Sequence, residues 1–171
     1  MIRLMLLILS LVTTAPALAE PGDRPSPSQR RGPWGMGLSD GLHELMAEIY
    51  RKTPPGQSPP ARYLSPALRA LLEADARRPQ PEVGDWLRGE GEPPVDELAI
   101  HVLNTSGSIG GQPAYASVSV SNFMRPGPGW GRRFRLIDQG GYWVIDDVVI
   151  YPGDVSLRSL LAEQRNCGAA C

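Results

Sequence analysis

The stretch that decides the fold is FRLIDQGGYWVIDDVVIYPGDVSLRSLL, residues 134–161. Two apolar runs of strand-like composition flank a turn at Gln139-Gly140, and together they predict an antiparallel hairpin. Apolar residues then recur at helical spacing between Val155 and Leu161, which predicts a short helix after the second strand. The stretch therefore predicts a strand–turn–strand–helix unit, and it contains no recognisable catalytic motif.

Two further strands precede the hairpin, at residues 98–105 and 113–123. In the second, small apolar residues alternate with serines, the period of a strand with one buried and one polar face. The segment SGSIGG joins the two as a turn. With the hairpin, they predict a meander of at least four antiparallel strands.

Two helices are expected before the strands. Residues 39–52 place Leu42, Leu45, Met46, Ile49 and Tyr50 on one face. Residues 65–78 begin with Ser65 as N-cap and a proline in the first turn. In the weakly patterned segment that follows, residues 86–87 (Trp-Leu) are the expected anchor into the core. The fold class is therefore α+β, with N-terminal helices packed on a curved antiparallel sheet and a short C-terminal helix.

The N-terminus has the organisation of a secretory signal peptide. Arg3 precedes an apolar run from Leu4 to Val12, and Ala17-Leu18-Ala19 forms a small-x-small cleavage site. The run is too short to span a bilayer. We therefore expect a periplasmic or secreted protein with no integral membrane segment after cleavage. The expected division is a signal peptide (1–19), a Pro/Gly-rich tether (20–38), one domain (39–165) and a cysteine-containing tail (166–171).

The charge balance does not point to nucleic acid or an anionic membrane as a partner. Lys and Arg number 17 against 18 Asp and Glu, and the formal net charge of −1 does not indicate a nucleic-acid partner. No motif for a cofactor or a metal is recognised. Cys167 and Cys171 are the two cysteines, and in an oxidising compartment we expect them to form a disulfide, provided that the helix has ended. A redox pair or a thiolate metal site is the alternative.

Asp146 and Asp147 are the first candidates for acid–base chemistry. Adjacent residues on a regular strand point to opposite faces, so they do not form a dyad. A hairpin register that pairs Ile137 with Tyr142 predicts cross-strand ion pairs instead. These pairs would be Arg133–Asp146 and Arg132–Asp147. The alternative is that one aspartate lines a pocket as a single general base with a raised pKa.

Three segments also resemble a known family. YLSPALRALL (63–72), YWVIDDVVIY (142–151) and SLRSLL (156–161) resemble exported bacterial domains of unknown function with the nuclear transport factor 2-like, or cystatin-like, fold. The resemblance covers roughly residues 39–163 and implies a cone, in which helices pack on a strongly curved sheet with a pocket at the open end. Members of this fold include ketosteroid-isomerase-like enzymes, dehydratases and binding proteins, so no catalytic residue is transferred. The matching positions are Tyr63, Leu64, Ser65, Pro66, Trp143, Ile145, Asp146, Asp147, Ser156 and Leu157.

Three functions remain open at this point. The favoured one is an exported non-catalytic binding module that holds a small apolar ligand or a protein partner in the cell envelope, with Tyr115, Tyr142 and Trp143 as candidate binding residues. The alternative is a pocket enzyme of ketosteroid-isomerase-like or dehydratase type, with Asp146, Asp147 or His101 as candidate catalytic residues. The third is an oligomer or adaptor, such as a homodimer formed through the outer face of the sheet, because the strand at 142–151 is apolar on both faces.

Overall fold

The computed structural model describes residues 25–26, 29, 36–77, 86–87, 95–107, 113–122, 131–151 and 154–167. Within these ranges the chain is an α+β protein, as the sequence predicts. The helices are α1 (Met36–Lys52), α2 (Pro66–Ala76) and α3 (Leu157–Cys167), with short 3-10 turns η3 (Ala61–Tyr63) and η4 (Val95–Glu97). The strands are β1 (Leu98–Ser106), β2 (Tyr115–Asn122), β3 (Gly131–Asp138), β4 (Trp143–Tyr151) and β5 (Val155–Ser156).

The strands form one antiparallel sheet in the order β1-β2-β3-β4-β5. The predicted meander is confirmed, and the short β5 extends it. The tight turn between β3 and β4 is centred on Gly140 and Gly141, whose φ angles of 66° and 90° are characteristic of a two-residue hairpin loop. Gln139 N–H closes this turn by donating to the Tyr142 carbonyl at 2.8 Å.

The predicted register of this hairpin is wrong. Because the turn is centred on the two glycines, Leu136 pairs with Ile145 rather than with Trp143. The register then shifts, and the next pair is Arg135 with Asp147, which leaves Asp146 without an opposite residue as a β-bulge. Arg133 and Arg132 consequently lie opposite Val149 and Ile150, and the two predicted ion pairs with the aspartates do not form.

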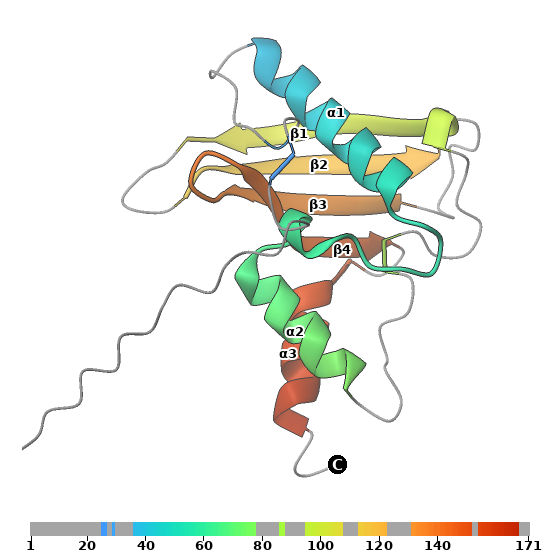
Figure 1. Cartoon of the computed structure of the whole chain (residues 1–171), viewed down its shortest axis with the longest axis vertical. Helices are drawn as coiled ribbons and strands as arrows, with labels where there is room; N and C mark the ends of the chain where they lie inside the picture. Colours follow the sequence, from blue (N-terminus) through green and yellow to red (C-terminus); the bar gives the residue numbers. More distant parts are fainter. Residues whose placement is uncertain are drawn as a thin grey trace, which may run out of the picture.

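Helix α1 crosses β1, β2 and β3 on one face of the sheet (Figure 1). It begins at Met36 rather than at the expected residue 39. Its side chains from Leu42, Leu45, Met46, Ile49 and Tyr50 are at most 1% exposed, and Tyr50 meets Phe134 of β3 edge to face, with ring centroids 6.1 Å apart. The buried residues that α1 and strands β2, β3 and β4 contribute to this core are Leu38, Leu42, Leu45, Met46, Ile49, Tyr50, Ala116, Val118, Val120, Phe134, Leu136, Trp143, Ile145 and Val148.

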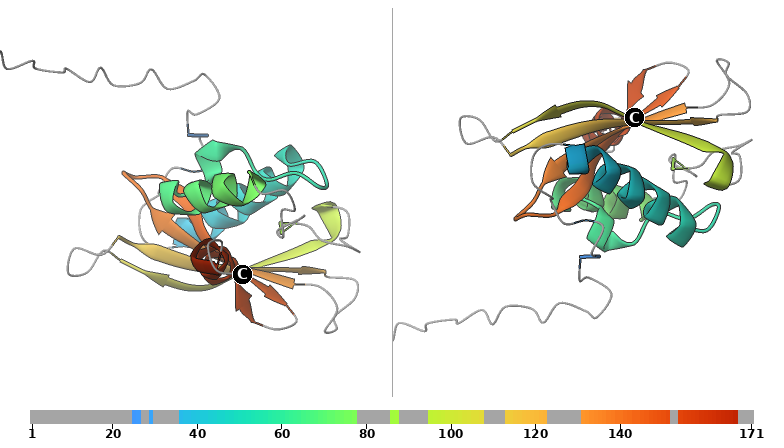
Figure 2. Two further views of the ribbon diagram at one scale, coloured as in Figure 1. Left: turned by 90° about the horizontal axis from the view of Figure 1, so that it is seen from below. Right: turned by 90° about the horizontal axis from the view of Figure 1, so that it is seen from above.

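Helices α2 and α3 pack against each other at the β4 end of the sheet. Figure 2 shows the hairpin end of β3 and β4 bending towards the side on which α1 and α2 lie. The N-terminal end of α2 is attached to β4 at the bulge, where Leu64 forms a parallel bridge with Ile145 and Ser65 N–H donates to the Ile145 carbonyl at 2.8 Å. The start of α2 therefore borders the bent part of β4.

Trp86 and Leu87 are both buried, as the sequence predicts. The Leu87 carbonyl accepts a hydrogen bond from the Tyr50 hydroxyl at 3.2 Å, and the Trp86 carbonyl accepts one from Arg132 Nε at 3.0 Å. These contacts fix this pair of residues to α1 and β3. They also give the buried Arg132 a structural role in place of the expected ion pair.

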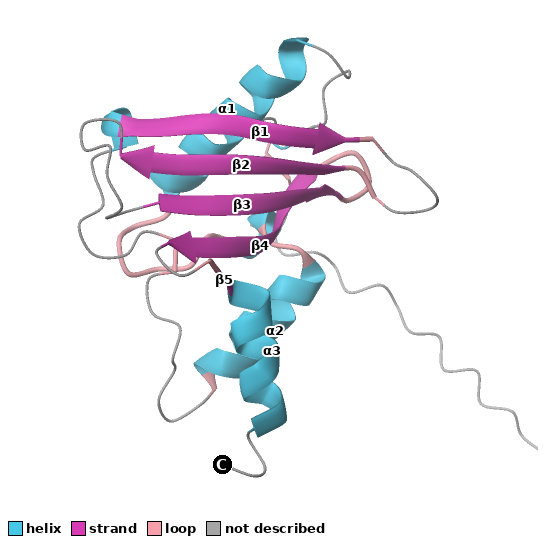
Figure 3. Ribbon diagram, turned by 180° about the vertical axis from the view of Figure 1, so that it is seen from behind, coloured by secondary structure: helices cyan, strands magenta, loops and turns pink. Residues whose placement is uncertain are grey.

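The opposite face of β1, β2 and β3 is polar. It is seen in Figure 3, where none of the described helices lies over these strands. One row across this face runs from His101 through Ser119 and Arg133 to Val149. The sequence of β4 suggested an apolar outer face, but on the neighbouring strands this face consists largely of serines and arginines.

Candidate functional site

Asp146, the bulged residue of β4, is directed at two helices. Its side chain is buried, with Oδ1 accepting a hydrogen bond from Ser65 Oγ at 2.9 Å and Oδ2 lying 2.6 Å from Arg158 Nη1. Ser65 Oγ also accepts from Leu68 N–H at 3.1 Å, which is the N-cap interaction of α2. Asp146 therefore joins the start of α2 to the first turn of α3.

Asp147 fixes the start of α3. Its Oδ1 accepts a hydrogen bond from Arg158 N–H at 3.0 Å, and its Oδ2 accepts one from Ser156 Oγ at 2.7 Å. Ser156 Oγ in turn accepts from Ser159 N–H at 3.2 Å and acts as the N-cap. A carboxylate at a helix N-terminus satisfies unpaired N–H groups and interacts favourably with the helix dipole.

The bulge interrupts the regular alternation on which the expectation of oppositely directed aspartates was based. Both of them contact Arg158, one through its guanidinium group and the other through its backbone N–H.

The other candidates lie apart from this network. His101 is exposed on β1, with β2 and β3 between it and β4. Tyr115 is half-buried at the start of β2, and its ring centroid lies 5.9 Å from the guanidinium carbon of Arg135. Trp143 is only 1% exposed and belongs to the core. Of the predicted catalytic and binding residues, Tyr142 is the one that lines the pocket described next.

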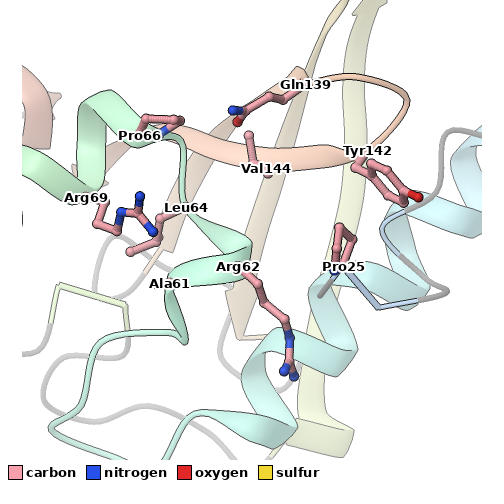
Figure 4. Close-up of a pocket in the computed structure, with 9 residues that line it drawn as sticks. All are labelled: Pro25, Ala61, Arg62, Leu64, Pro66, Arg69, Gln139, Tyr142 and Val144. Atoms are coloured by element: carbon pink, nitrogen blue, oxygen red, sulfur yellow. The ribbon is translucent and has the colours of Figure 1, made fainter. Parts of the chain in front are cut away.

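A pocket of about 280 Å³ lies between the hairpin, η3 and the first turn of α2. We call it the hairpin pocket. Its walls come from segments that are distant in the sequence, and none of the lining residues is acidic. The lining residues are Pro25, Ala61, Arg62, Leu64, Pro66, Arg69, Gln139, Tyr142 and Val144 (Figure 4).

The two arginines of the hairpin pocket differ in their contacts. Arg62 points away from the other labelled side chains in Figure 4, and its Nη2 donates to the Tyr63 hydroxyl at 3.0 Å. Its guanidinium carbon also lies 4.7 Å from the centroid of the Tyr63 ring. The Arg69 guanidinium lies beside Leu64 and Pro66, and its Nε is 3.9 Å from Glu73 Oε1 on the same helix. Arg69 is therefore the cation presented to the pocket.

One wall of the pocket comes from the segment expected to be a tether. Gln29 is fully buried, and its Nε2 donates to the Arg62 carbonyl at 2.7 Å and to the Trp143 carbonyl at 3.3 Å. Its Oε1 accepts from Ser26 N–H at 2.7 Å. These bonds attach the segment that carries Pro25 to η3 and β4. An extended tether does not account for these contacts.

A charged cluster centred on Glu48 of α1 contacts Ser26 of this N-terminal segment. Ser26 Oγ donates to Glu48 Oε2 at 3.1 Å, and the Tyr63 hydroxyl donates to Oε1 at 2.7 Å. Burial alone would raise the pKa of Glu48, but hydrogen bonds from Lys52, Tyr63 and Ser26 outweigh it and hold the pKa below its ordinary value. The hydrogen bond to Glu48 raises the pKa of Lys52. The cluster therefore favours an ionised Glu48.

A second cavity, of about 400 Å³, lies between the start of α1 and β1. It is lined by Leu38, Ser39 and residues 102–105. Leu103 is the bulged residue of β1 and is 54% exposed. The lining contains no titratable side chain, so we do not consider it a chemical site.

Three other observations limit the possible sites. Among the described residues no group of three or more His, Cys, Asp or Glu side chains could hold a metal ion. None of the helices in the same ranges combines the length and the apolar composition that crossing a bilayer requires. Residues 1–19 and Cys171 lie outside the described ranges, and the side chain of Cys167 is not described, so the signal peptide and the disulfide stay predictions.

Comparison with protein-family models, with curated proteins and with solved structures finds no match for this chain. The residues that line the hairpin pocket were not identifiable from the sequence, apart from Tyr142. Arg69 lies in the segment 63–72 and Gln139 in the predicted turn, but the sequence assigns a binding role to neither, and only the fold brings them together with Arg62. The functional argument therefore depends on the geometry of the pocket and of the aspartate network.

Proposed function

We propose that the protein is an exported, non-catalytic binding module of the cell envelope, and that the hairpin pocket is its binding site for a small molecule. The observation that carries the proposal is the contrast between two groups of candidate residues. Asp146 and Asp147, the best catalytic candidates, bind the starts of two helices, whereas Tyr142 lies in an open pocket together with Arg69 and Gln139.

A general base must reach its substrate, and the two aspartates are poorly placed for that role. Asp146 is 6% exposed, and its two carboxylate oxygens interact with Ser65 and Arg158. Asp147 uses both of its oxygens at the start of α3. These contacts support binding over the ketosteroid-isomerase-like or dehydratase alternative.

We also propose the nuclear transport factor 2-like architecture for this domain. The residues that carry the family resemblance are supported as a structural motif, because Ser65, Asp146, Asp147 and Ser156 belong to one network around Arg158. The bend of the β3–β4 hairpin towards the helices is compatible with a curved sheet (Figure 2). Core side chains fill the contact between α1 and the sheet, so we place the ligand at the rim beside the hairpin.

The test is a fragment screen followed by amide NMR on the mature protein. We expect the bound fragments to shift the amide signals of Tyr142, Val144 and Arg69. Ala61→Trp should abolish binding by filling the pocket, because Ala61 is one of its lining residues. Ala67→Trp adds the same side chain at an exposed position of α2 outside the lining, and it should leave binding unchanged. Equal effects of the two variants, or shifts confined to other surfaces, would refute the proposal.

A further inference from the structure

We infer that the hairpin pocket selects a small ligand that carries a carboxylate beside a short apolar body, with Arg69 binding the carboxylate. The inference rests on the proposed function and adds the chemical class of the ligand. It replaces the purely apolar ligand that the sequence favours.

The charge of the lining is the first reason. Two of the nine lining residues are arginines and none is acidic, so the pocket favours an anion over a cation or a neutral molecule. Gln139 and Tyr142 add polar groups from the hairpin. Leu64, Val144 and the two prolines supply apolar surface beside these groups. A ligand with one charged end and one apolar end would contact both kinds of surface.

The state of Arg69 is the second reason. Among the described residues the only carboxylate near its guanidinium is that of Glu73, at 3.9 Å, which is longer than a hydrogen bond. The side chains of this pair are 42% and 57% exposed, so solvent screens their attraction. A guanidinium group in this state retains donors for a planar carboxylate, which it can bind through two parallel hydrogen bonds. Arg62, in contrast, already contacts Tyr63.

The size of the pocket is the third reason. A volume of about 280 Å³ lies just below the usual range for small-molecule sites, which begins at roughly 300 Å³. The pocket is therefore suited to a short-chain acid rather than to a large lipid or a nucleotide. The segment that carries Pro25 encloses it on one side, held by the buried Gln29.

The experiment compares three probes on the mature full-length protein by NMR titration: hexanoate, its neutral amide hexanamide, and inorganic phosphate. We expect hexanoate to bind at least about tenfold more tightly than hexanamide, because only the acid forms charge-assisted hydrogen bonds. We also expect it to bind more tightly than phosphate, which has no apolar body. Arg69→Ala should remove the preference for hexanoate over hexanamide.

Arg77→Ala is the matched control, because Arg77 is the C-cap residue of the same helix. Its Nη2 also lies 3.9 Å from Glu73 Oε2, but it does not line the pocket. This variant should leave the preference intact. Glu73→Gln, which removes the acidic neighbour of Arg69, should tighten hexanoate binding by up to about fivefold.

Equal binding of hexanoate and hexanamide at Tyr142 and Val144 would overturn the carboxylate inference and leave the proposed binding module standing. An equal loss in the Arg69 and Arg77 variants would also overturn it, since a general charge effect would then explain the preference. If phosphate bound as tightly as hexanoate, the apolar part of the ligand would not contribute to binding, and that part of the inference would be wrong. Failure of all three probes to shift the pocket amides would refute the inference, while the fragment screen would still decide the proposed function.

Discussion

Ser65 Oγ donates a hydrogen bond to Asp146 Oδ1 at 2.9 Å, although 81 positions of the chain separate the two residues. The same hydroxyl oxygen accepts the N-cap hydrogen bond of α2 from Leu68 N–H. A single side chain thus begins a helix and holds the bulged residue of β4. Because both partners are buried, water cannot replace either of them without local opening.

Ser65→Ala should lower the free energy of unfolding by about 2 kcal/mol, because it removes the cap and leaves a buried Asp146 oxygen without its donor. Urea unfolding measures this loss. Ser159→Ala is the control, since Ser159 is exposed on α3, and its effect should stay within about 0.5 kcal/mol. Similar losses in both variants would show that the Ser65–Asp146 contact contributes nothing specific.

Asp147→Ala should destabilise the first turn of α3 by about 1–2 kcal/mol, because Arg158 N–H and Ser156 Oγ lose their acceptor. Amide hydrogen exchange should show faster exchange at Arg158, and urea unfolding should give the global loss. The control is Asp96→Ala, at an exposed position of η4. Unchanged exchange at Arg158 would contradict the capping role.

Gln29→Ala should cost about 1–3 kcal/mol of stability, because the buried amide bonds to two carbonyl groups and to one N–H. The comparison is Gln57→Ala, whose side chain is exposed after α1 and should be almost neutral. If the two glutamine variants unfold at the same urea concentration, the N-terminal segment is not part of the folded domain.

Glu48 should make stability depend on pH in the acid range. Its pKa is lowered in the folded protein from the ordinary value of 4.5, so its contribution is complete above that value and is lost as the pH falls through the lower folded pKa. The stability difference between the natural protein and Glu48→Gln should therefore be largest near neutral pH and shrink below about pH 4.5. Urea unfolding from about pH 7 to about pH 3 tests this, with the exposed Glu44→Gln as control. A difference that grows on acidification would have the wrong sign.

Export and disulfide formation can be tested together by intact mass measurement. The protein recovered from an exported preparation should begin at Glu20, and its mass should lack the hydrogen of each thiol if Cys167 and Cys171 form the expected disulfide. Reduction should restore those hydrogens. The mass of the Cys171→Ser variant should not change on reduction. A mass that corresponds to a chain beginning at Met1 would exclude cleavage at the expected site.

The sequence was sufficient for the three helices and the four long strands because their signals are local. It did not indicate the short β5, and Val155 lies in that strand rather than in α3. The alternation of small apolar residues and serines marked β2, and the Ser65-Pro66 pair marked the start of α2. Trp86 and Leu87 were recognisable as an anchor because they form an adjacent apolar pair in a weakly patterned segment.

The register of the hairpin could not be obtained in the same way. The sequence permits turns centred on Gln139-Gly140 or on Gly140-Gly141, and each choice shifts every cross-strand pair. The bulge at Asp146 depends on Ser65 and Arg158, which hold its carboxylate from two helices. Since these partners are distant in the sequence, no local pattern indicates that the strand is irregular at this point.

The candidate site was less predictable than the fold. Tyr142 is one of the three binding residues expected from the sequence, and it lines the pocket. Arg69 was only one residue of an amphipathic helix, and Gln29 was one polar residue in a segment rich in Pro, Gly and Ser. Their roles depend on tertiary contacts between η3, α2 and β4, which composition does not encode.

The hydrogen bond from Gln29 to the Trp143 carbonyl spans 114 positions and has a consequence for the order of folding. The meander brings together strands that are neighbours in the sequence, and such contacts form early because they close short loops. Gln29 finds its second acceptor only after β4 has been synthesised and paired. We therefore expect the Gln29–Trp143 contact to form late in folding, so that the Pro25 wall of the hairpin pocket becomes fixed only after β4 has paired.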